Sequence, residues 1–183
     1  MTAEQKFELA FKCLVVNEGR YSNLPGDRGK RTWYGVSEKH HPVFFARMDA
    51  AKTDAERLDI ARACYCVLYW QPMQCNSFSL LVAFRLFDSA VVAGAGAATR
   101  CLQQAANVGK AGLLVDGKFG PKTLAAARLL DAGYPRNLVG WMTYYLGAYF
   151  MGLEARKPGV YTEFLWGWGR RLEEPSELHR LVQ

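Results

Sequence analysis

The chain has 183 residues, half of them hydrophobic and 22% of them charged, a balance that excludes an intrinsically disordered protein. This length suits one well-buried domain, alone or with a small appendage. The formal net charge of +6 favours an anionic partner, such as nucleic acid, anionic lipid or the carboxylate-bearing bacterial cell wall.

Apolar residues recur at helical spacing along most of the chain and predict a mainly α fold. The expected helices cover residues 4–18, 53–70, 78–92, 97–108, 121–130, 135–155 and 160–172. Threonines stand in cap position before the first two, and prolines stand in the first turn of later ones. Only residues 20–37, rich in glycine and other turn residues, are suited to a short β-hairpin or loop.

Two segments resemble targeting or membrane elements at first sight. The first helix mixes acids and lysines with its apolar residues, which argues against a signal peptide. Residues 137–153 are 17 consecutive uncharged residues, which is the short limit for a membrane span, and they include three tyrosines and three glycines. We therefore expect a buried core helix there and no stable membrane insertion.

Cysteine and histidine spacing gives no sign of a metal site. The five cysteines are an odd number without a CxxC pair, which is typical of small buried side chains in a reducing compartment. His40 and His41 lack a partner at ligand spacing, so a solvated turn is expected there. We expect neither a metal ion nor any other cofactor.

Three side chains with catalytic potential lie in or beside the glycine-rich bend. Glu18 falls at the C-terminal end of the first helix, where backbone carbonyls disfavour an ionised carboxylate and so favour a general acid. Asp27 lies among arginines, whose charges favour the ionised form. Thr32 is suited to holding an attacking water. Acids and glycines in a bend are also ordinary turn chemistry, so these three residues alone do not establish a catalytic site.

The segment EGRYSNLPGDRGKRTWYGVS resembles the signature of the glycoside hydrolase family 108 muramidases. The residues in register with that signature are Glu18, Gly19, Tyr21, Ser22, Asn23, Pro25, Asp27, Gly29, Thr32, Tyr34, Gly35 and Val36. Arg20 and Lys30 replace two glycines of the pattern. The resemblance implies that Glu18 is the catalytic glutamate. The order Glu, Asp, Thr is also similar to that of phage lysozymes, which places Asp27 and Thr32 in partner roles.

A second resemblance covers the C-terminal half. Residues 87–108 and 115–127 are similar to the peptidoglycan-binding region that this family shares. The matching residues are Asp88, Gly94, Ala98, Leu102, Gln103, Asp116, Gly117, Gly120, Pro121, Thr123, Leu124, Phe164, Gly167 and Trp168. Val92 replaces an asparagine of the family. The resemblance predicts a lysozyme-like catalytic region at 1–95 and a helical peptidoglycan-binding region at 96–183, packed as one compact unit.

These features together predict a peptidoglycan hydrolase that cleaves the β-1,4 bond between N-acetylmuramic acid and N-acetylglucosamine without a cofactor. Glu18 is the expected general acid. Tyr21, Asn23, Trp33 and Tyr34 are expected to bind the substrate, and the aromatic pair Trp33 and Tyr34 is suited to stacking on a sugar face.

Two other classes of function stay open at this point. One is a non-catalytic cell-wall-binding or secretion-accessory module of the same fold. The other is a nucleic-acid binder, which is less well supported because the basic residues are scattered rather than arranged in a stripe. We expect a monomer, made in the cytoplasm without a signal peptide, that reaches the periplasm or cell wall through a holin-like pore or another export route.

Overall fold

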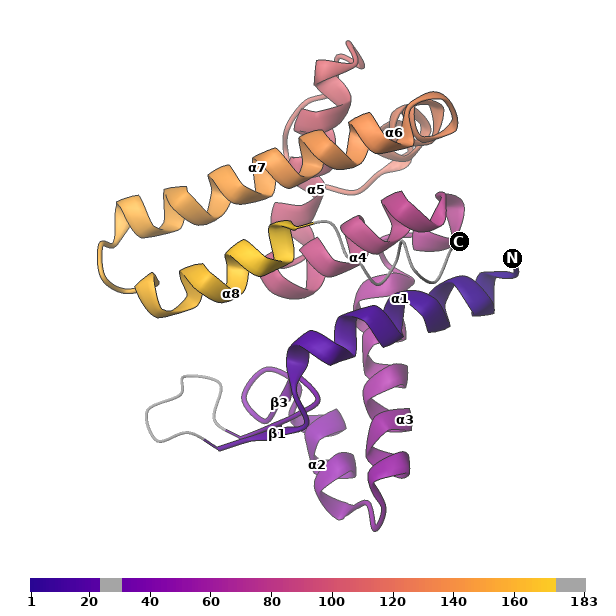
Figure 1. Ribbon diagram of the computed structural model, residues 1–183. Coiled ribbons are helices and arrows are strands. Elements are labelled where there is room, and N and C mark those ends of the chain that lie inside the picture. Colours follow the sequence, from indigo (N-terminus) through magenta and orange to yellow (C-terminus); the bar gives the residue numbers. More distant parts are fainter. Residues whose placement is uncertain (24–30, 174–183) are drawn as a thin grey trace. The chain divides into compact units, whose positions relative to one another are not determined.

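The computed structural model of the chain describes residues 1–23 and 31–173. It forms two compact units, residues 1–71 and 72–183. Helices make up nearly all the regular structure of the described residues, and one small antiparallel sheet accompanies them (Figure 1). The predicted mainly α, lysozyme-like fold with a short β element is confirmed.

The first unit begins with α1 (Ala3–Glu18), which Thr2 caps in a reciprocal pair of hydrogen bonds with Gln5. Gly19 follows with a φ of +70°, a left-handed conformation that glycine adopts without strain. The chain then enters an antiparallel sheet with β2 as the central strand, formed by β1 (Tyr21–Ser22), β2 (Thr32–Trp33) and β3 (Val36–Ser37). The predicted hairpin region therefore does hold the β structure.

Two helices complete the first unit, and they pack against each other (Figure 1). α2 (Pro42–Ala50), which the sequence pattern did not predict, begins with a proline in its first turn. α3 (Asp54–Tyr65) is capped by Thr53, as expected. The helix predicted over 53–70 is not regular throughout, because its last turn is the π-helical segment η1 (Cys66–Trp70).

The core of the first unit joins α1 to α3 and η1 through aromatic contacts. The Phe7 and Trp70 rings lie 5.3 Å apart between centroids, and the Phe11 and Tyr65 rings lie 5.9 Å apart. Leu14, one turn before Glu18, is fully buried. Burial of this apolar face fixes the rotation of α1 and therefore the direction of its last residue.

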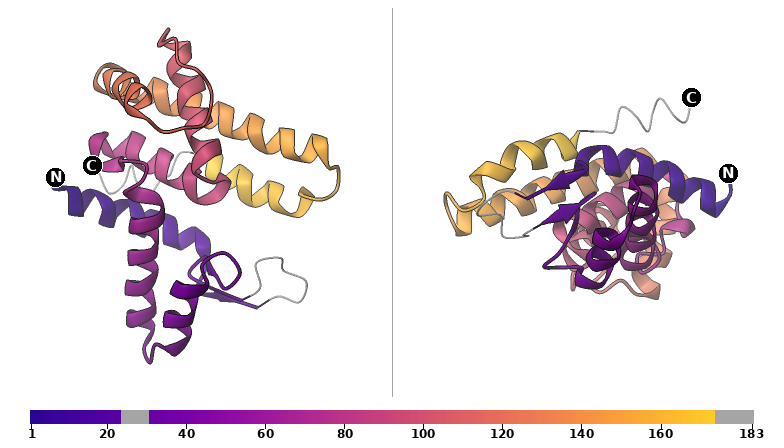
Figure 2. Two further views of the ribbon diagram at one scale, coloured as in Figure 1. Left: turned by 180° about the vertical axis from the view of Figure 1, so that it is seen from behind. Right: turned by 90° about the horizontal axis from the view of Figure 1, so that it is seen from below.

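The second unit is helical throughout its described residues. A 3-10 turn, η2 (Cys75–Ser77), precedes five helices: α4 (Leu80–Ala93), α5 (Ala95–Val108), α6 (Pro121–Gly133), α7 (Pro135–Arg156) and α8 (Thr162–Leu172). α4, α5 and α7 pack against one another, and α7 runs beside α8 (Figure 2). Leu102 and Leu146 are fully buried, and the Phe150 ring stacks on Trp168 at 4.4 Å.

The segment expected to be a buried core helix is α7, and only one of its sides is buried. Leu138, Met142, Leu146 and Phe150 recur at helical spacing on that side. Trp141, Tyr144 and Met151 are exposed. Among the described residues, no helix combines the length and the apolar character that crossing a bilayer requires.

The predicted turn at residues 116–121 is built around the buried Gln103 of α5. Its amide oxygen accepts from the Gly117 N–H at 2.9 Å, and its amide nitrogen donates to Asp116 Oδ1 at 2.9 Å and to Thr123 Oγ1 at 3.1 Å. Gly117 has a φ of +75°, and a Cβ there would collide with Arg100. These residues of the second resemblance therefore hold a turn between α5 and α6.

Candidate active site

Glu18 is the last residue of α1, and its side chain is half-buried. The carboxylate lies at the end of the helix where the last carbonyl groups carry partial negative charge. Gly19 turns the chain away immediately afterwards. The position of Glu18 at the C-terminal end of the first helix is the one that the sequence predicted.

Gly35, in the turn between β2 and β3, lies against this carboxyl group. A Cβ at Gly35 would lie 2.5 Å from Glu18 Oε2 and closer still to the hydroxyl of Tyr65. Both polar groups therefore lie against the bare Cα of Gly35. The Tyr65 hydroxyl donates a hydrogen bond to the Tyr34 carbonyl at 3.0 Å, which holds it in this turn.

A second tyrosine and a histidine extend the cluster. Burial raises the pKa of Tyr69 to about 12, and the charges of Cys64 and then Glu18 contribute to the rise. Tyr69 Oη and His41 Nε2 are hydrogen-bonded at 3.0 Å. Burial lowers the pKa of His41, and the neighbouring His40 adds to this effect, so His41 is neutral at pH 7. His41 is thus half-buried rather than part of a fully solvated turn.

Thr32, the third member of the predicted trio, lies in the central strand of the sheet. It pairs with Ser22 of β1 and Ser37 of β3, and its side chain is half-buried. Asp27, the predicted second carboxylate, lies outside the described residues. The structure thus describes the first and third members of the trio, and the roles of all three stay predictions.

Two of the predicted substrate-binding aromatics have partners within the protein. Trp33 packs on the Tyr21 ring at 4.5 Å, and the Arg57 guanidinium lies 4.6 Å over its indole. Tyr34 donates a hydrogen bond to Asp54 Oδ2 at 2.6 Å, and burial followed by this contact raises the pKa of Tyr34.

The other two predicted substrate-binding residues, Tyr21 and Asn23, are exposed. Tyr21 presents 48% of its surface to solvent, whereas Trp33 is half-buried beneath it and beneath Arg57. Tyr21 therefore offers the more accessible aromatic face for a sugar ring.

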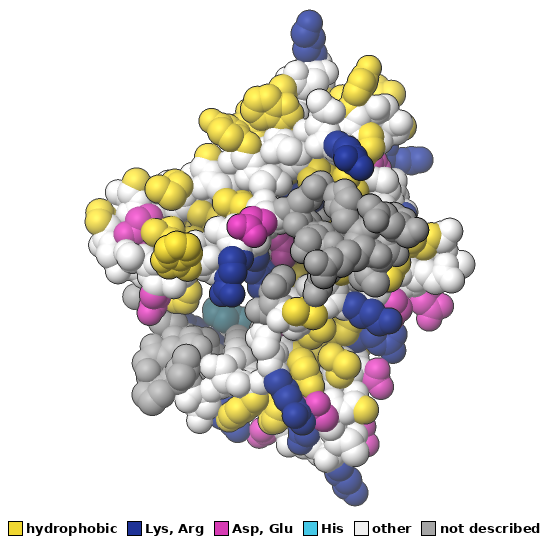
Figure 3. Space-filling view, viewed as in Figure 1, with side chains coloured by type: hydrophobic (Ala, Val, Ile, Leu, Met, Phe, Trp, Pro, Cys, Tyr) yellow, Lys and Arg dark blue, Asp and Glu magenta, His cyan; other side chains and the backbone are white. Residues whose placement is uncertain are grey.

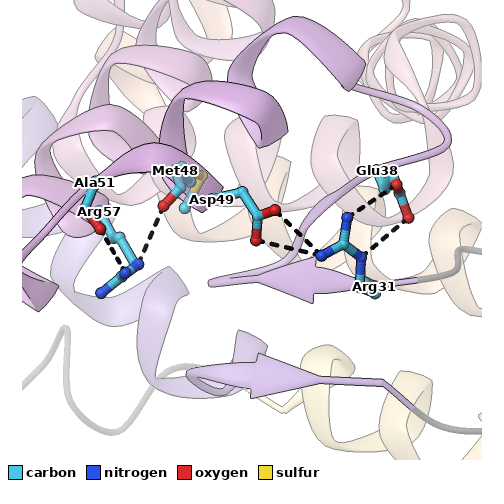
Figure 4. Close-up of polar contacts among 6 residues, drawn as sticks. All are labelled: Arg31, Glu38, Met48, Asp49, Ala51 and Arg57. Carbon is cyan, nitrogen blue, oxygen red and sulfur yellow. Dashed lines mark hydrogen bonds and ion pairs between the residues drawn. The ribbon is translucent and has the colours of Figure 1, made fainter.

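Arginines fasten the sheet to α2 and α3. Arg31 binds Glu38 at 3.1 Å and Asp49 at 3.2 Å, and it lies 4.9 Å over the Phe45 ring. Arg57 donates to the backbone carbonyls of Met48 at 3.1 Å and Ala51 at 2.5 Å. Figure 4 shows the hydrogen bonds and ion pairs of the two arginines.

Arg20, which replaces a glycine of the resembled signature, makes an ion pair with Asp54 at 3.0 Å. The Tyr34 hydroxyl and then Arg20 hold the pKa of Asp54 below its ordinary value. Arg20 and Arg31, which the sequence placed near Asp27, thus pair with other acids among the described residues.

Sequence reasoning did not single out Tyr65 or Tyr69, and it placed His41 in a solvated turn. Tyr65 and Tyr69 are four positions apart, a spacing that places both on one face of a helical segment. That spacing was a usable signal for a polar pair beside the site. The position of His41 beside Tyr69 carried no local signal, because 28 residues separate the two.

A helical unit with a glutamate at the end of its first helix, followed by a small sheet, is the arrangement of a lysozyme-like fold. Comparison with known proteins adds the class of enzyme and the polymer on which it acts. Residues 11–94 belong to the family described as glycosyl hydrolase 108, and residues 97–173 match the model described as a predicted peptidoglycan domain. The two matches together identify a glycoside hydrolase that acts on peptidoglycan, with the family 108 match at residues 11–94.

A solved structure supports the fold along nearly the whole chain. The structure titled "Structure of Brucella abortus SagA" matches with a TM-score of 0.70 and 23% sequence identity, over 98% of this chain and 95% of that one. At this identity the likeness establishes the fold alone. No curated protein matches the chain.

Proposed function

We propose that this peptidoglycan hydrolase is an N-acetylmuramidase, with Glu18 as the general acid for the β-1,4 bond between N-acetylmuramic acid and N-acetylglucosamine. The observation that carries the proposal is the position of the Glu18 carboxyl group, at the end of α1 and against the side-chain-free Gly35. A half-buried carboxyl group at the negative end of a helix is suited to delivering a proton to a leaving oxygen.

Besides proton delivery by Glu18, the reaction requires a second group that activates a nucleophile for attack on the anomeric carbon. We assign this role to Asp27, with Thr32 holding the nucleophilic water, because a threonine that follows the aspartate this closely in the sequence has little purpose if Asp27 attacks the sugar directly. The proposal therefore includes inversion at the anomeric carbon. Inverting glycosidases separate their carboxyl groups by about 6.5–9.5 Å to admit a water, whereas retaining ones place them about 5–5.5 Å apart.

Substrate contacts are assigned to the exposed side of the sheet. Tyr21 supplies an accessible ring for stacking on a sugar, and Asn23 supplies an exposed amide. Trp33 and Tyr34 act beneath them by holding that surface in place through Arg57 and Asp54. The enzyme acts where its polymer is, in the periplasm or cell wall.

The test is a digest of purified peptidoglycan with mass analysis of the new reducing ends. N-acetylmuramic acid at those ends is the expected result. Reducing N-acetylglucosamine would identify a glucosaminidase, and free peptides would identify an amidase or endopeptidase. Proton NMR of fresh product checks the stereochemistry, since an initial β-anomer would contradict inversion.

The role of Glu18 is tested by Glu18→Gln, with Glu4→Gln as a matched control in the first turn of the same helix. General acid catalysis contributes about 10²–10⁴-fold to the rate. Glu18→Gln is therefore expected to lower turnover by at least about 10²-fold, whereas Glu4→Gln should keep the wild-type turnover. Binding to walls should survive in both. Turnover by Glu18→Gln above roughly a tenth of the wild-type rate would remove Glu18 from this role.

The second candidate is a non-catalytic wall-binding module of the same fold. The observation that favours it is the separate peptidoglycan-domain match at residues 97–173. In that case, purified walls would sediment the protein, but no variant or condition would release new reducing ends.

A further inference from the structure

An open pocket of about 200 Å³ lies in the second unit, where the end of α5, the end of α6 and the start of α7 meet. The lining residues that matter for its chemistry are Ala105, Leu130, Tyr134, Asn137, Leu138 and Trp141. Pockets for drug-sized ligands are commonly about 300–1,000 Å³. This smaller volume suits a single sugar ring or part of one.

The pocket has an apolar floor and aromatic walls that reach the solvent. Leu138 and Ala105 are buried, whereas Tyr134 is 66% exposed and Trp141 is 41% exposed. The Trp141 ring is supported by Tyr144 at 5.7 Å and Tyr145 at 6.2 Å between centroids. Figure 3 shows hydrophobic side chains at the surface in the α6–α7 part of this unit. An indole that is held in place yet exposed loses little conformational entropy on binding.

Gly109 also lines the pocket. A Cβ at this position would lie 2.7 Å from Leu130 Cδ2, so the glycine allows the leucine to close over the end of α5. The pocket thus depends on the close contact between α5 and α6.

An amide lines the pocket, and two cations stand next to lining residues in the sequence. Asn137 is exposed at the start of α7. Lys110 and Arg136, each next in sequence to a lining residue, are exposed and make no ion pair within the described part of the chain. Asp131, the acid nearest in sequence, is buried and bound to Ser79, with Oδ2 accepting from the backbone N–H at 2.6 Å. Of the charged residues next in sequence to the lining, the exposed ones are therefore both cations.

We propose that this pocket binds an N-acetylated amino sugar of the peptidoglycan strand, at a position that carries stem-peptide carboxylates. Trp141 and Tyr134 supply aromatic faces for the C–H face of the sugar, Asn137 supplies an amide for the acetamido group, and Lys110 and Arg136 attract the carboxylates. The inference rests on the proposed action on peptidoglycan and assigns a specific site to the second unit.

The experiment measures sedimentation of the full chain with purified sacculi, with Glu18→Gln in every variant so that the wall is not cleaved. Trp141→Ala and Asn137→Ala are compared with Trp166→Ala, a matched control because Trp166 is 86% exposed in the same unit and lies outside the pocket. Trp141→Ala is expected to weaken binding about tenfold or more, Asn137→Ala to weaken it less, and Trp166→Ala to leave it within about twofold.

Circular dichroism melts of all variants confirm that they are folded. Sacculus binding that Trp141→Ala and Asn137→Ala both leave unchanged would overturn the proposal. Trp141-dependent binding to phosphatidylglycerol vesicles without binding to sacculi would also overturn it, since the pocket would then bind lipid. A change of solution mass from dimer to monomer in Trp141→Ala would show that a second copy of the chain covers the pocket.

Failure of the muramidase proposal is distinguishable from failure of the pocket. If the wild type releases no muramic acid reducing ends but Trp141→Ala still weakens sacculus binding, the pocket stands and the catalytic assignment fails. If the wild type cleaves normally and Trp141→Ala and Asn137→Ala both bind like their parent, the catalytic assignment stands and the pocket is refuted.

Discussion

Gly35 decides how closely the β2–β3 turn approaches Glu18. Its φ of +75° is unfavourable for a side chain, and the space where a Cβ would stand is taken by Glu18 Oε2 and the Tyr65 hydroxyl. The resembled signature includes this glycine. The structure supplies a physical reason for it, because any side chain here displaces the carboxyl group that we assign as the acid.

Gly35→Ala is therefore expected to lower specific activity much more than its loss of unfolding free energy can explain. A displacement of about 1 Å in a catalytic group can cost about 10²-fold in rate. Gly159→Ala is the matched control, because Gly159 has a similar φ of +82° with open space around it. Both variants should lose of order 1 kcal/mol of unfolding free energy from backbone strain. Equal specific activity of the two variants on purified walls would contradict the steric argument.

His41 should make the stability of the protein depend on pH. Its folded pKa is lowered by burial, so between this value and the unfolded value of about 6.5 the unfolded chain binds more protons. Its contribution is therefore fully present above about pH 6.5 and is lost as the pH falls through the folded pKa.

Urea titrations between pH 7.5 and pH 5 test this expectation. The free energy of unfolding of His41→Gln should fall less with decreasing pH than that of the wild type. His40→Gln, a change at the exposed neighbouring residue, is the control and should keep most of the wild-type slope. Identical slopes for His41→Gln and the wild type would show that His41 is not the titrating group.

Among the elements, α3 links most of the contacts near the site. Its first residue, Asp54, binds Tyr34 and Arg20, its Arg57 lies over Trp33, and its last residue, Tyr65, contacts the Gly35 turn. The start and the end of one helix thus both touch the sheet region. A change in the first turn of α3 is therefore expected to affect the sheet as well as the helix.

Thr53→Ala tests the start of α3. The Thr53 hydroxyl accepts from the Glu56 N–H at 3.2 Å, and Glu56 bonds back to the Thr53 N–H at 3.2 Å. Loss of such a cap typically costs about 1 kcal/mol of unfolding free energy. Thr2→Ala removes the same kind of capping box from α1 and should cost less, because the first turn of α3 also binds Tyr34 and Arg20 through Asp54. Chemical denaturation of both variants measures the difference, and an equal loss would argue against a special role for the α3 cap.

At the scale of the whole molecule, the spatial units and the family matches divide the chain at different places. The glycosyl hydrolase match extends to residue 94, through α4. In the structure α4 belongs to the second unit, where it packs on α5 and α7. All nine residues from Val82 to Ala90 are buried. The predicted regions 1–95 and 96–183 stay a prediction that truncation can test.

A fragment of residues 72–183 is expected to melt cooperatively, whereas a fragment of residues 96–183 is not. The shorter fragment lacks α4 and so exposes the apolar faces of α5 and α7 that this helix covers. Thermal melts followed by circular dichroism, with dye binding to report exposed apolar surface, compare the two. A cooperative melt of the shorter fragment at a similar temperature would show that α4 is dispensable for the second unit.

Local patterns in the sequence were sufficient to predict the helical fold class, the positions of most helices and the position of the sheet. Helical periodicity, capping threonines and first-turn prolines act within a few residues, so they can be read without tertiary information. The position of Glu18 at a helix end is information of this kind. The missed helix α2 shows the limit, because a nine-residue helix with two buried residues carries a weak pattern.

The surroundings of Glu18 were decided by tertiary structure alone. Tyr65 reaches the turn of Tyr34 across 31 positions, and His41 meets Tyr69 across 28. The pocket beside Trp141 likewise joins the ends of three helices. No local window contains both partners of such a contact, and burial of the apolar faces of the helices brings them together. The sequence therefore determined which elements form and where the acid stands, while packing determined what surrounds it.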